Sequence, residues 1–467
     1  MQNFWQQYRS DIRQTFLLSL PIIIGQLGNI LMGLFDNAMV GAMTSTAFDP
    51  NEPERYGAMA VAAAGVSNAI YFLFTVLGVG IMMAVSTLVS ISKAKDDTAA
   101  CGGYLKYSIV ASFLITVLLT VVLLLMIDNI ELFVKGELIQ KMGREYLFII
   151  TLGTFPMLAG LAVKNFTDGL SYTKPAMVIT LIGVVMNIFL NWLFIYGNWG
   201  FPAWELNGAG YATVISRVFI FVALLVYVFR SKLLAAYRVM PKGINLASPQ
   251  LKQIFKIGLP SGLQYFFEVG AFAAANVMTT WIGPYQSAAH QVALYLAAVS
   301  YMISVGLSSG GAIRVGTAFS DRNLGAIKRA GYSALIWVTF SMAITASIFL
   351  IFNQTLPGLF NKQADVMAYA SSLLLIAALF QFSDGAQAVA LGILRGVTDV
   401  RYPTVVTLFA YWAVGLPLAY VFAFNFDLGV EGIWYGLTIG LTISAVLLTR
   451  RFWVLTTKKS PFSPKFD

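Results

Sequence analysis

Long apolar stretches, separated by shorter polar segments, recur along the whole chain. Each stretch is about 20 residues or longer, which is the length that a helix needs to cross a bilayer. The second, seventh, eighth and tenth stretches are longer than this, so we expect those helices to tilt or to protrude. The pattern predicts twelve membrane-spanning helices, at residues 14–41, 57–91, 104–127, 139–163, 173–197, 208–230, 253–283, 286–314, 330–352, 366–394, 403–424 and 430–453.

The composition agrees with an all-α polytopic membrane protein. Of the 467 residues, 58% are hydrophobic and only 11% are charged, and the mean hydropathy is +0.75. A soluble protein of this length would need a charged surface that this sequence lacks. The single cysteine, Cys101, and the single histidine, His290, exclude an intrachain disulfide and a multi-histidine metal site. The polar start, Met1 to Arg13, predicts no cleavable signal peptide.

The charged residues between the predicted spans set the orientation. Of the 30 Lys and Arg residues, 24 fall on the side of the N-terminus and five on the opposite side, whereas 11 of the 21 acids fall on the opposite side and seven on the N-terminal side. The positive-inside rule therefore predicts that both termini are cytoplasmic. Because the basic residues are scattered over seven segments of one membrane face, they argue against nucleic-acid binding.

The two halves of the chain share a common order of motifs. Leu20-Pro21 opens the first span and Leu259-Pro260 opens the seventh, and the same offset aligns Asn37 with Asn276. Six spans in each half return the chain to the same side, so the halves are expected to be parallel repeats. We therefore predict an N-terminal lobe at residues 1–235, a cytoplasmic linker at 236–252 and a C-terminal lobe at 253–467, with a site between two lobes that rock.

Three acids lie deep in predicted spans: Asp36, Glu268 and Asp384. Glu268 follows Leu259 by nine residues, which is about 14 Å along a helix. A carboxylate at that depth costs several kcal/mol unless it faces water, an ion or a partner. Glu268 and Asp384 are expected at similar depth in the second half, where such a pair could share a proton or a monovalent cation. The alternative is a separate structural hydrogen bond for each acid.

Amides and a hydroxyl accompany the acid of the first half. Asn187 and Asn191 are spaced i, i+4 on the fifth span, so both amides point the same way, and Thr213 on the sixth span could reach them. Carboxylate, amide and hydroxyl oxygens suit a hard cation such as Na⁺, so Asp36, Asn187 and Asn191 form a candidate metal site. Amides that hydrogen-bond between helices explain the same pattern equally well.

Aromatic residues surround the second-half acids and could line a pocket for planar cations through cation–π contact. Ordinary core packing is the alternative. We expect His290 to have a packing or gating role. We expect Arg217 to pair with a neighbour or to snorkel. The sequence contains no phosphate loop and no nucleophile elbow, which argues against an ATP-driven pump, an intramembrane hydrolase or any other enzyme. The residues that we expect to line the pocket are Phe266, Phe272, Asn276, Phe380 and Gln381.

Taken together, these motifs resemble the multidrug and toxic compound extrusion (MATE) family, and within it the bacterial NorM-like branch. The matching pieces span nearly the whole chain in order. They are the Leu-Pro pairs of the first and seventh spans, FDNAMVG at 35–41, NIFLNW at 187–192, GLPSG at 258–262 with Glu268 eight residues after its proline, AAHQVAL at 288–294, IRVG at 313–316 and LRGVTD at 394–399.

The resemblance implies a twelve-helix, two-lobe antiporter that expels cationic or amphipathic compounds in exchange for Na⁺ or H⁺. By matching position, Glu268 and Asp384 look like the coupling acids of the second lobe. Asp36, Asn187, Asn191 and Thr213 look like the first-lobe cation site. One departure concerns Phe380, which stands where NorM-like members often carry Tyr. Its missing hydroxyl weakens the expectation of Na⁺ in the second lobe and favours the first.

Other functions remain as alternatives. A lipid-linked oligosaccharide flippase of the same superfamily would need Arg and Lys for an anionic pyrophosphate, whereas the predicted spans hold three acids and only Arg217 lies clearly within one. A receptor or channel fits the repeat less well than alternating access does. The resemblance places the protein in a bacterial inner membrane. We further expect a monomer that uses no cofactor apart from the coupling ion.

Overall fold

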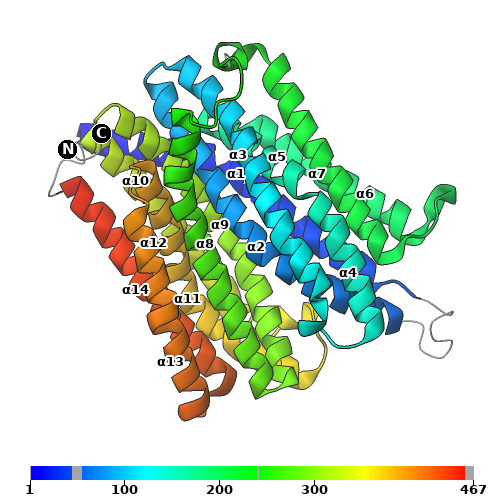
Figure 1. Cartoon of the computed structure of the whole chain (residues 1–467). Helices are drawn as coiled ribbons and strands as arrows, with labels where there is room; N and C mark the ends of the chain where they lie inside the picture. Colours follow the sequence, from blue (N-terminus) through cyan, green and yellow to red (C-terminus); the bar gives the residue numbers. More distant parts are fainter. Residues whose placement is uncertain (1, 45–54, 239–240, 458–467) are drawn as a thin grey trace. The chain divides into compact units, whose positions relative to one another are not determined.

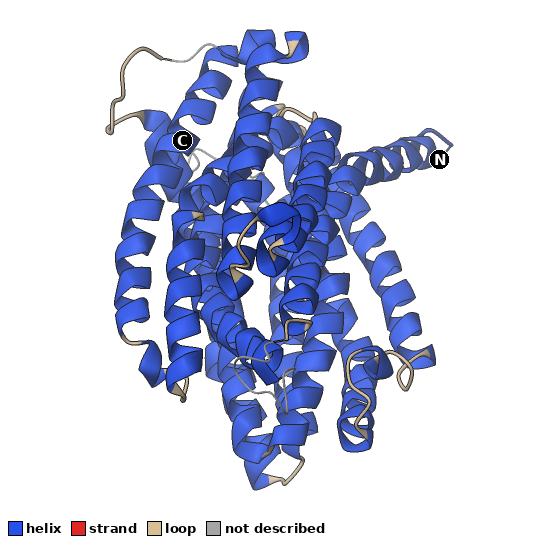
Figure 2. Ribbon diagram, turned by 90° about the vertical axis from the view of Figure 1, so that its right-hand side faces the viewer, coloured by secondary structure: helices blue, strands red, loops and turns tan. Residues whose placement is uncertain are grey.

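The computed structural model describes residues 2–44, 55–238 and 241–457, and every regular element in these ranges is a helix (Figures 1 and 2). The predicted all-helical fold class is therefore confirmed. Outside the described residues lie outer-side acids such as Asp49, residues 239–240 of the predicted linker and the last basic residues, Lys458, Lys459 and Lys465.

The long helices follow the predicted spans closely, and most of them extend a few residues beyond the predicted limits. The first helix begins at Gln2 rather than near residue 14, so the polar start is helical as well. The bounds are α1 Gln2–Gly41, α2 Arg55–Ala94, α3 Thr98–Asp128, α4 Glu137–Leu152, α5 Thr154–Gly169, α6 Thr173–Tyr196, α7 Glu205–Arg230, α8 Pro249–Ile282, α9 Pro284–Ser320, α10 Leu324–Ile351, α11 Ala364–Gly396, α12 Arg401–Leu408, α13 Leu416–Tyr420 and α14 Gly429–Thr457.

Eleven of the helical segments are long and apolar enough to cross a membrane, within the described residues. Helix α8, with 34 residues, is not among the eleven, but it covers all except the last residue of the predicted seventh span and brings the set of long helical segments to the expected twelve. Helices suit this environment because lipid offers no partner for backbone N–H and C=O groups, which must therefore bond within the segment.

Two predicted spans are interrupted. The fourth is divided into α4 and α5 at Gly153, because Pro156 lacks the N–H that would bond to the carbonyl of Leu152. The eleventh starts as α12 and then widens into π-helical segments at Phe409–Gly415 and Val421–Asn425, on either side of α13. Such π segments occur often at functional sites. The apolar periodicity alone does not reveal either interruption.

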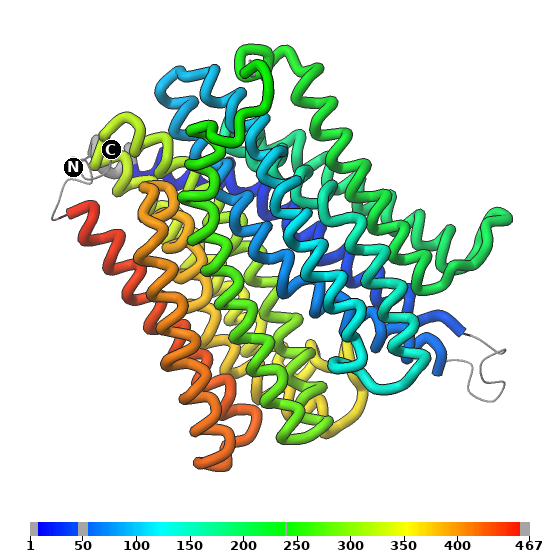
Figure 3. Tube along the Cα trace, in the orientation of Figure 1, coloured from blue at the N-terminus to red at the C-terminus, as the bar shows by residue number. Residues whose placement is uncertain are grey.

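Contacts between Cα atoms divide the chain into two compact units. Unit 1 comprises residues 1–26, 86–96 and 259–467, and unit 2 comprises residues 27–85 and 97–258. The chain can be followed through both units by colour in Figure 3. The start of α1 and the end of α2 thus group with helices of the second half. The predicted lobes, which are divided at residues 236–252, follow the two halves of the sequence and are not the same as these units. The division into lobes stays a prediction.

Close helix packing in unit 1 depends on small residues. Gly392 of α11 lies against Ser308 of α9, and a Cβ atom at Gly392 would come within 2.3 Å of the Ser308 carbonyl oxygen. The Ser308 hydroxyl donates to the carbonyl oxygen of Ala388 at 2.6 Å. Small side chains allow this approach, which is how helices associate where no hydrophobic difference from lipid drives them together. Helix α11 is thereby fixed against α9, which positions Asp384.

Polar contacts hold the start of α1 in unit 1. The Asp11 carboxylate accepts hydrogen bonds from Arg314 of α9 and, at 2.8 Å, from Arg329 of α10. The indole N–H of Trp337 donates to the carbonyl oxygen of Ile12 at 2.8 Å, and the Trp337 ring stacks on Phe16 with 4.4 Å between ring centroids. These contacts explain why the first residues of the chain group with α9 and α10.

Candidate cation sites

The first candidate site lies within unit 2 and brings together the four residues that the sequence predicts. Asp36 comes from α1, Asn187 and Asn191 from one face of α6, and Thr213 from α7. Both asparagines are fully buried, as the i, i+4 spacing on an inward face requires, whereas Asp36 is half-buried. The site is therefore built by three helices, and the Asp36 carboxylate is its only charged member.

Each carboxylate oxygen of Asp36 accepts one hydrogen bond. Asn191 donates to Oδ1 through its side-chain amide, and the Thr213 hydroxyl donates to Oδ2 at 3.3 Å. Asn187 continues the network, because its amide donates to the Thr213 hydroxyl at 3.4 Å and its Oδ1 accepts from Asn191 at 3.3 Å. The four side chains thus form a single connected network. The alternative explanation, in which the amides only hydrogen-bond between helices, requires the same network.

One buried oxygen of this network is left over. Asn191 Oδ1 has no hydrogen-bond partner among the described residues. A monovalent cation beside Asp36 could be held by the carboxylate, the Thr213 hydroxyl and, after rotation of its amide, this oxygen. No group of three or more His, Cys, Asp or Glu side chains that could hold a metal occurs within the described ranges, so any ion here would depend on amide and hydroxyl oxygens.

Arg217 lies one helical turn beyond Thr213 on α7. Its guanidinium donates to the Tyr71 hydroxyl at 2.8 Å and lies 5.1 Å from the centroid of the Tyr71 ring. Thr154 donates to the same hydroxyl at 3.3 Å. The expectation that Arg217 pairs with a neighbour is therefore confirmed. Its positive charge also acts on Asp36, so a fixed cation lies near the carboxylate of the site without belonging to the network.

The second candidate site lies within unit 1 and contains the two predicted acids. Glu268 of α8 and Asp384 of α11 are each only 4% exposed, and their charges interact. The Tyr301 hydroxyl on α9 donates to Glu268 Oε1 at 3.3 Å. Glu268 Oε2 is buried and has no hydrogen-bond partner among the described residues. An acceptor oxygen in this state is suited to a proton or a cation.

A phenol from the π-helical segment completes the second site. Tyr411 is fully buried and interacts electrostatically with both acids. The side-chain amide of Gln387 on α11 donates to the Tyr411 hydroxyl at 2.8 Å. This hydrogen bond orients the Tyr411 hydroxyl toward α11. Because the extra residue of a π turn shifts the side chains that follow, the local helix geometry determines where Tyr411 points.

Two of the predicted pocket aromatics lie next to this network. The Phe272 ring lies 6.2 Å from the Phe380 ring and 6.2 Å from the Tyr411 ring, measured between centroids. Phe380 also packs on Trp434 at 5.6 Å. Phe272 is half-buried, whereas Phe380 is almost completely buried. Phe272 is therefore better placed to meet a bound molecule, and Phe380 forms part of the packing behind it.

The other three predicted pocket residues make contacts away from the acids. Gln381 is fully buried and exchanges hydrogen bonds with Ser300 at 3.0 and 2.6 Å. Asn276 accepts a hydrogen bond from Gln291 at 2.7 Å, and Phe266 packs against Phe267. Within the described ranges, none of these contacts involves Glu268 or Asp384, so the role of the three residues in a substrate pocket stays a prediction.

Sequence reasoning missed Tyr301, Tyr411 and Gln387. Gln387 could have been found, because it lies three residues after Asp384 and therefore on the same side of one helix. Tyr301 and Tyr411 belong to other helices, and nothing in the apolar pattern distinguishes them from ordinary aromatic residues of a span. Only the packing of α9 and of the π-helical segment against α8 brings their hydroxyls to Glu268.

His290 packs against an aromatic side chain in this structure, which agrees with the expected packing or gating role. It is fully buried, and its Nδ1 accepts a hydrogen bond from the Trp434 indole at 3.1 Å. The two rings meet edge to face with 5.9 Å between centroids. Trp434 in turn packs on Phe380 with 5.6 Å between ring centroids.

Comparison with known proteins gives a consistent result. The family model MatE matches residues 53–193 and 260–421. A probable multidrug resistance protein NorM of Mannheimia succiniciproducens is 31% identical over 463 residues, which cover 96% of this chain and 95% of that protein. The multidrug resistance protein NorM of Aliivibrio fischeri is 32% identical over 461 residues, which cover 96% of both proteins.

Solved structures share the same fold. A crystal structure of a eukaryotic MATE transporter superposes with a TM-score of 0.86 at 19% sequence identity, and the match covers 97% of both chains. A multidrug resistance transporter of the MATE family in an outward-facing conformation superposes with a TM-score of 0.83 at 20% identity, over 96% of this chain and 97% of that one. The twelve-helix architecture inferred from hydrophobicity is thus a known one.

Proposed function

The chain belongs to the MATE family, and from this premise we propose that it is a secondary antiporter that exports cationic and amphipathic compounds in exchange for Na⁺ or H⁺. The multidrug resistance proteins that it resembles support export of small molecules. The coupling to an ion and the cationic nature of the cargo rest on the acids within the membrane-spanning helices.

The unpartnered oxygen of Glu268 carries this proposal. A buried carboxylate oxygen without a hydrogen bond costs about 1–3 kcal/mol, and more when it is charged. A second acid, Asp384, adds repulsion when both are ionised. Binding of a proton or a cation removes both costs, so the pair gains free energy from the coupling ion. A cationic cargo could gain the same free energy, because it offers the same charge.

Exchange follows from this competition. If ion and cargo neutralise the same acids, each displaces the other, and one moves inward as the other moves outward. Binding at Asp36 could act differently, by favouring one arrangement of the two lobes over the other. In both cases the coupling is a difference in affinity between two states, which is reciprocal between ion and cargo.

We place the protein in the inner membrane of a bacterium, with both termini in the cytoplasm. The distribution of 24 inner and five outer Lys and Arg residues supports this orientation. We further propose that it works as a monomer, binds no nucleic acid and needs no cofactor other than the coupling ion. Its partners are then the lipid bilayer and its small cationic cargo.

The test is efflux of ethidium from liposomes that contain the purified protein. A Na⁺ gradient and a pH gradient are imposed separately, and a protein-free liposome serves as the control. Efflux under Na⁺ alone would assign Asp36, Asn187 and Asn191 to a metal-ion site. Efflux under a pH gradient alone would make the acids proton carriers. Efflux under neither gradient would contradict the proposal and direct attention to lipid-linked oligosaccharides.

A further inference from the structure

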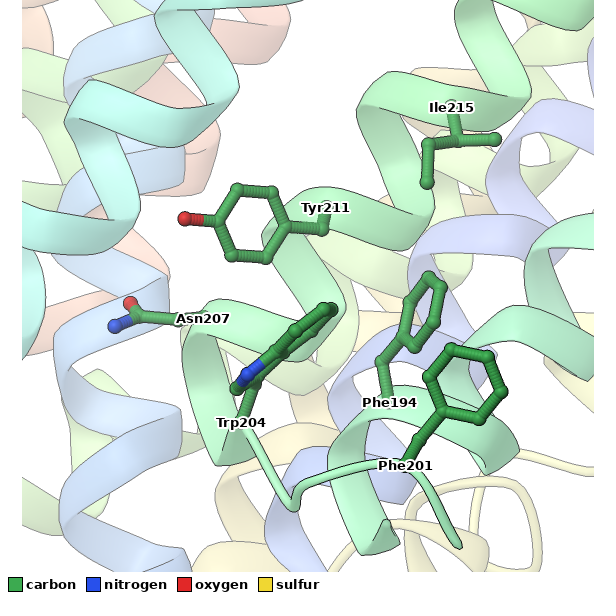
Figure 4. A pocket seen from close by; sticks show the side chains of 6 residues that line it. All are labelled: Phe194, Phe201, Trp204, Asn207, Tyr211 and Ile215. Atoms are coloured by element: carbon green, nitrogen blue, oxygen red, sulfur yellow. The ribbon is translucent and has the colours of Figure 1, made fainter. Parts of the chain in front are cut away.

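A cavity of about 590 Å³ lies at the predicted outer end of the α6–α7 hairpin in unit 2 (Figure 4). Its walls come from the end of α6, the connecting loop and the first three turns of α7. None of its lining residues belongs to either acid site. The residues that line it are Phe194, Phe201, Trp204, Asn207, Tyr211 and Ile215.

Four of these residues form a continuous series of aromatic rings. Phe201 meets Phe194 at 5.7 Å between centroids, Phe194 meets Trp204 at 5.1 Å, and Trp204 meets Tyr211 at 5.4 Å. The contacts are tilted or edge to face, and Figure 4 shows these rings, with Asn207 and Ile215, as the side chains that line the cavity. Ring faces carry negative electrostatic potential and attract cations, most strongly when the cation is poorly hydrated.

Carboxylates lie directly behind the aromatic wall. Trp204 and Asn207 also line a smaller cavity of about 160 Å³, together with Glu145, Glu205 and one basic residue, Lys141. The Asn207 amide donates to Glu145 at 2.7 Å, and the Tyr56 hydroxyl donates to Glu205. The two carboxylates outnumber the single ammonium among these lining residues. The charge behind the rings is therefore negative and complements a cation.

An interfacial aromatic belt is the simpler explanation for Trp and Tyr residues at this level. Trp199 of the same loop fits that explanation, since it is 75% exposed and does not line the cavity. Phe194 does not fit it, because its side chain is 7% exposed and forms a wall of the cavity. Two phenylalanines in a cavity with carboxylates behind it indicate a binding site rather than an anchor.

We propose that this cavity, the hairpin site, binds hydrophobic organic cations at the predicted outer surface. The proposal rests on the proposed function, because it identifies the occupant with the cargo class. An aromatic wall accepts the apolar body, and Glu145 and Glu205 supply the long-range attraction. The side chains of Tyr211 and Ile215 are exposed, so the site opens toward the surrounding lipid, where such compounds accumulate.

The test is equilibrium binding of radiolabelled tetraphenylphosphonium to the protein in nanodiscs, with no ion gradient. In a variant that carries Asp36→Asn, Glu268→Gln and Asp384→Asn, we expect saturable binding at one site to persist. Adding Trp204→Leu should weaken this binding by about three- to fivefold, which corresponds to the loss of one cation–π contact. Trp199→Leu is the matched control and should leave the affinity unchanged. Should the triple variant fold poorly, Trp204→Leu in the unmodified chain should weaken one class of sites by the same factor and leave the other classes unchanged.

Charge gives an independent arm of the same experiment. Glu205→Gln should weaken binding, whereas Glu137→Gln, at the start of α4 and outside both cavities, should not. The neutral triphenylphosphine oxide should not compete. Absence of saturable binding in the triple variant, equal effects of Trp204→Leu and Trp199→Leu, or competition by the neutral compound would overturn the proposal. Weaker binding in nanodiscs that contain phosphatidylethanolamine would instead assign the site to a lipid head group. This experiment measures binding and not transport. Its result can therefore be interpreted even if ion-driven efflux is not observed.

Discussion

The two acid sites differ in how their carboxylates are satisfied. Asp36 is half-buried, and both of its oxygens accept hydrogen bonds, from Asn191 and from Thr213. Glu268 is buried beside a second acid; its Oε1 accepts a hydrogen bond from Tyr301, whereas its Oε2 has no partner that meets hydrogen-bond geometry among the described residues. An ionised carboxylate is therefore supported by neutral donors at the first site, whereas at the second it is opposed by burial and by like charge.

This difference suggests a division of roles. The second site gains most from a bound proton or cation, because its empty, ionised state costs most. The first site is a network that can exist with or without an ion, and Arg217 already supplies a positive charge nearby. We therefore expect the second site to drive the exchange and the first to tune its dependence on the ion. Four predictions test this comparison, in order of decreasing expected effect.

The largest effect is expected at the second site. Glu268→Gln and Asp384→Asn each imitate a permanently neutral acid, so the gain from binding an ion is lost. Ethidium efflux from liposomes should fall by about two orders of magnitude, the upper range for a coupling free energy. Glu431→Gln is the control, because this acid bonds to Ser372 in the same unit, outside the site. If both variants transported like the unmodified protein, the second site would have no part in coupling.

A smaller loss is expected at the first site. Asp36→Asn keeps the shape of the side chain and removes the only carboxylate of the network. Efflux should fall by about tenfold, and the remaining transport should no longer depend on which ion gradient is imposed. The measurement compares efflux under Na⁺ and pH gradients, with Glu137→Gln as a control. Unaltered ion dependence in the Asp36→Asn protein would show that this network is only structural.

Tyr411→Phe tests whether the phenol supports the second site. The change leaves the packing of the ring intact and removes the hydroxyl that accepts from Gln387. An unsatisfied buried amide costs about 1–3 kcal/mol, so the melting temperature should fall and efflux should drop by about fivefold. Tyr420→Phe is the matched control, because Tyr420 ends α13 and is exposed. Equal behaviour of the two variants would contradict a role for Tyr411.

The sequence predicted the fold better than the second site. Apolar length located the spans, because lipid imposes one requirement on every crossing helix. The residues of the first site could also be predicted, because Asn187 and Asn191 share one helix face and therefore lie close enough to hydrogen-bond to each other. The phenols of Tyr301 and Tyr411 could not be predicted, because they reach Glu268 only through the packing of separate helices. The π turns that position Tyr411 leave no signal in hydrophobic periodicity.

The smallest expected effect concerns Phe380, where the resemblance described above leads us to expect Tyr. Its ring is buried against Trp434 and Phe272, so Phe380→Tyr adds a hydroxyl to a filled space at a cost of about 1 kcal/mol. If the new hydroxyl reaches the acids, the Na⁺ concentration for half-maximal efflux should fall by about two- to fivefold, as one added oxygen ligand would give. Phe382→Tyr, on the exposed side of the same helix, is the control.

The outcome of Phe380→Tyr also bears on the comparison between the sites. A gain in Na⁺ dependence would mean that the second site lacks only one oxygen, and that the phenols of Tyr301 and Tyr411 do not replace it. No change in Na⁺ dependence, with folding intact, would mean that these phenols already satisfy the acids and that the second site exchanges protons. Of the two candidate sites, the first would then be the one at which Na⁺ acts, and Asp36→Asn should abolish whatever Na⁺ dependence is measured.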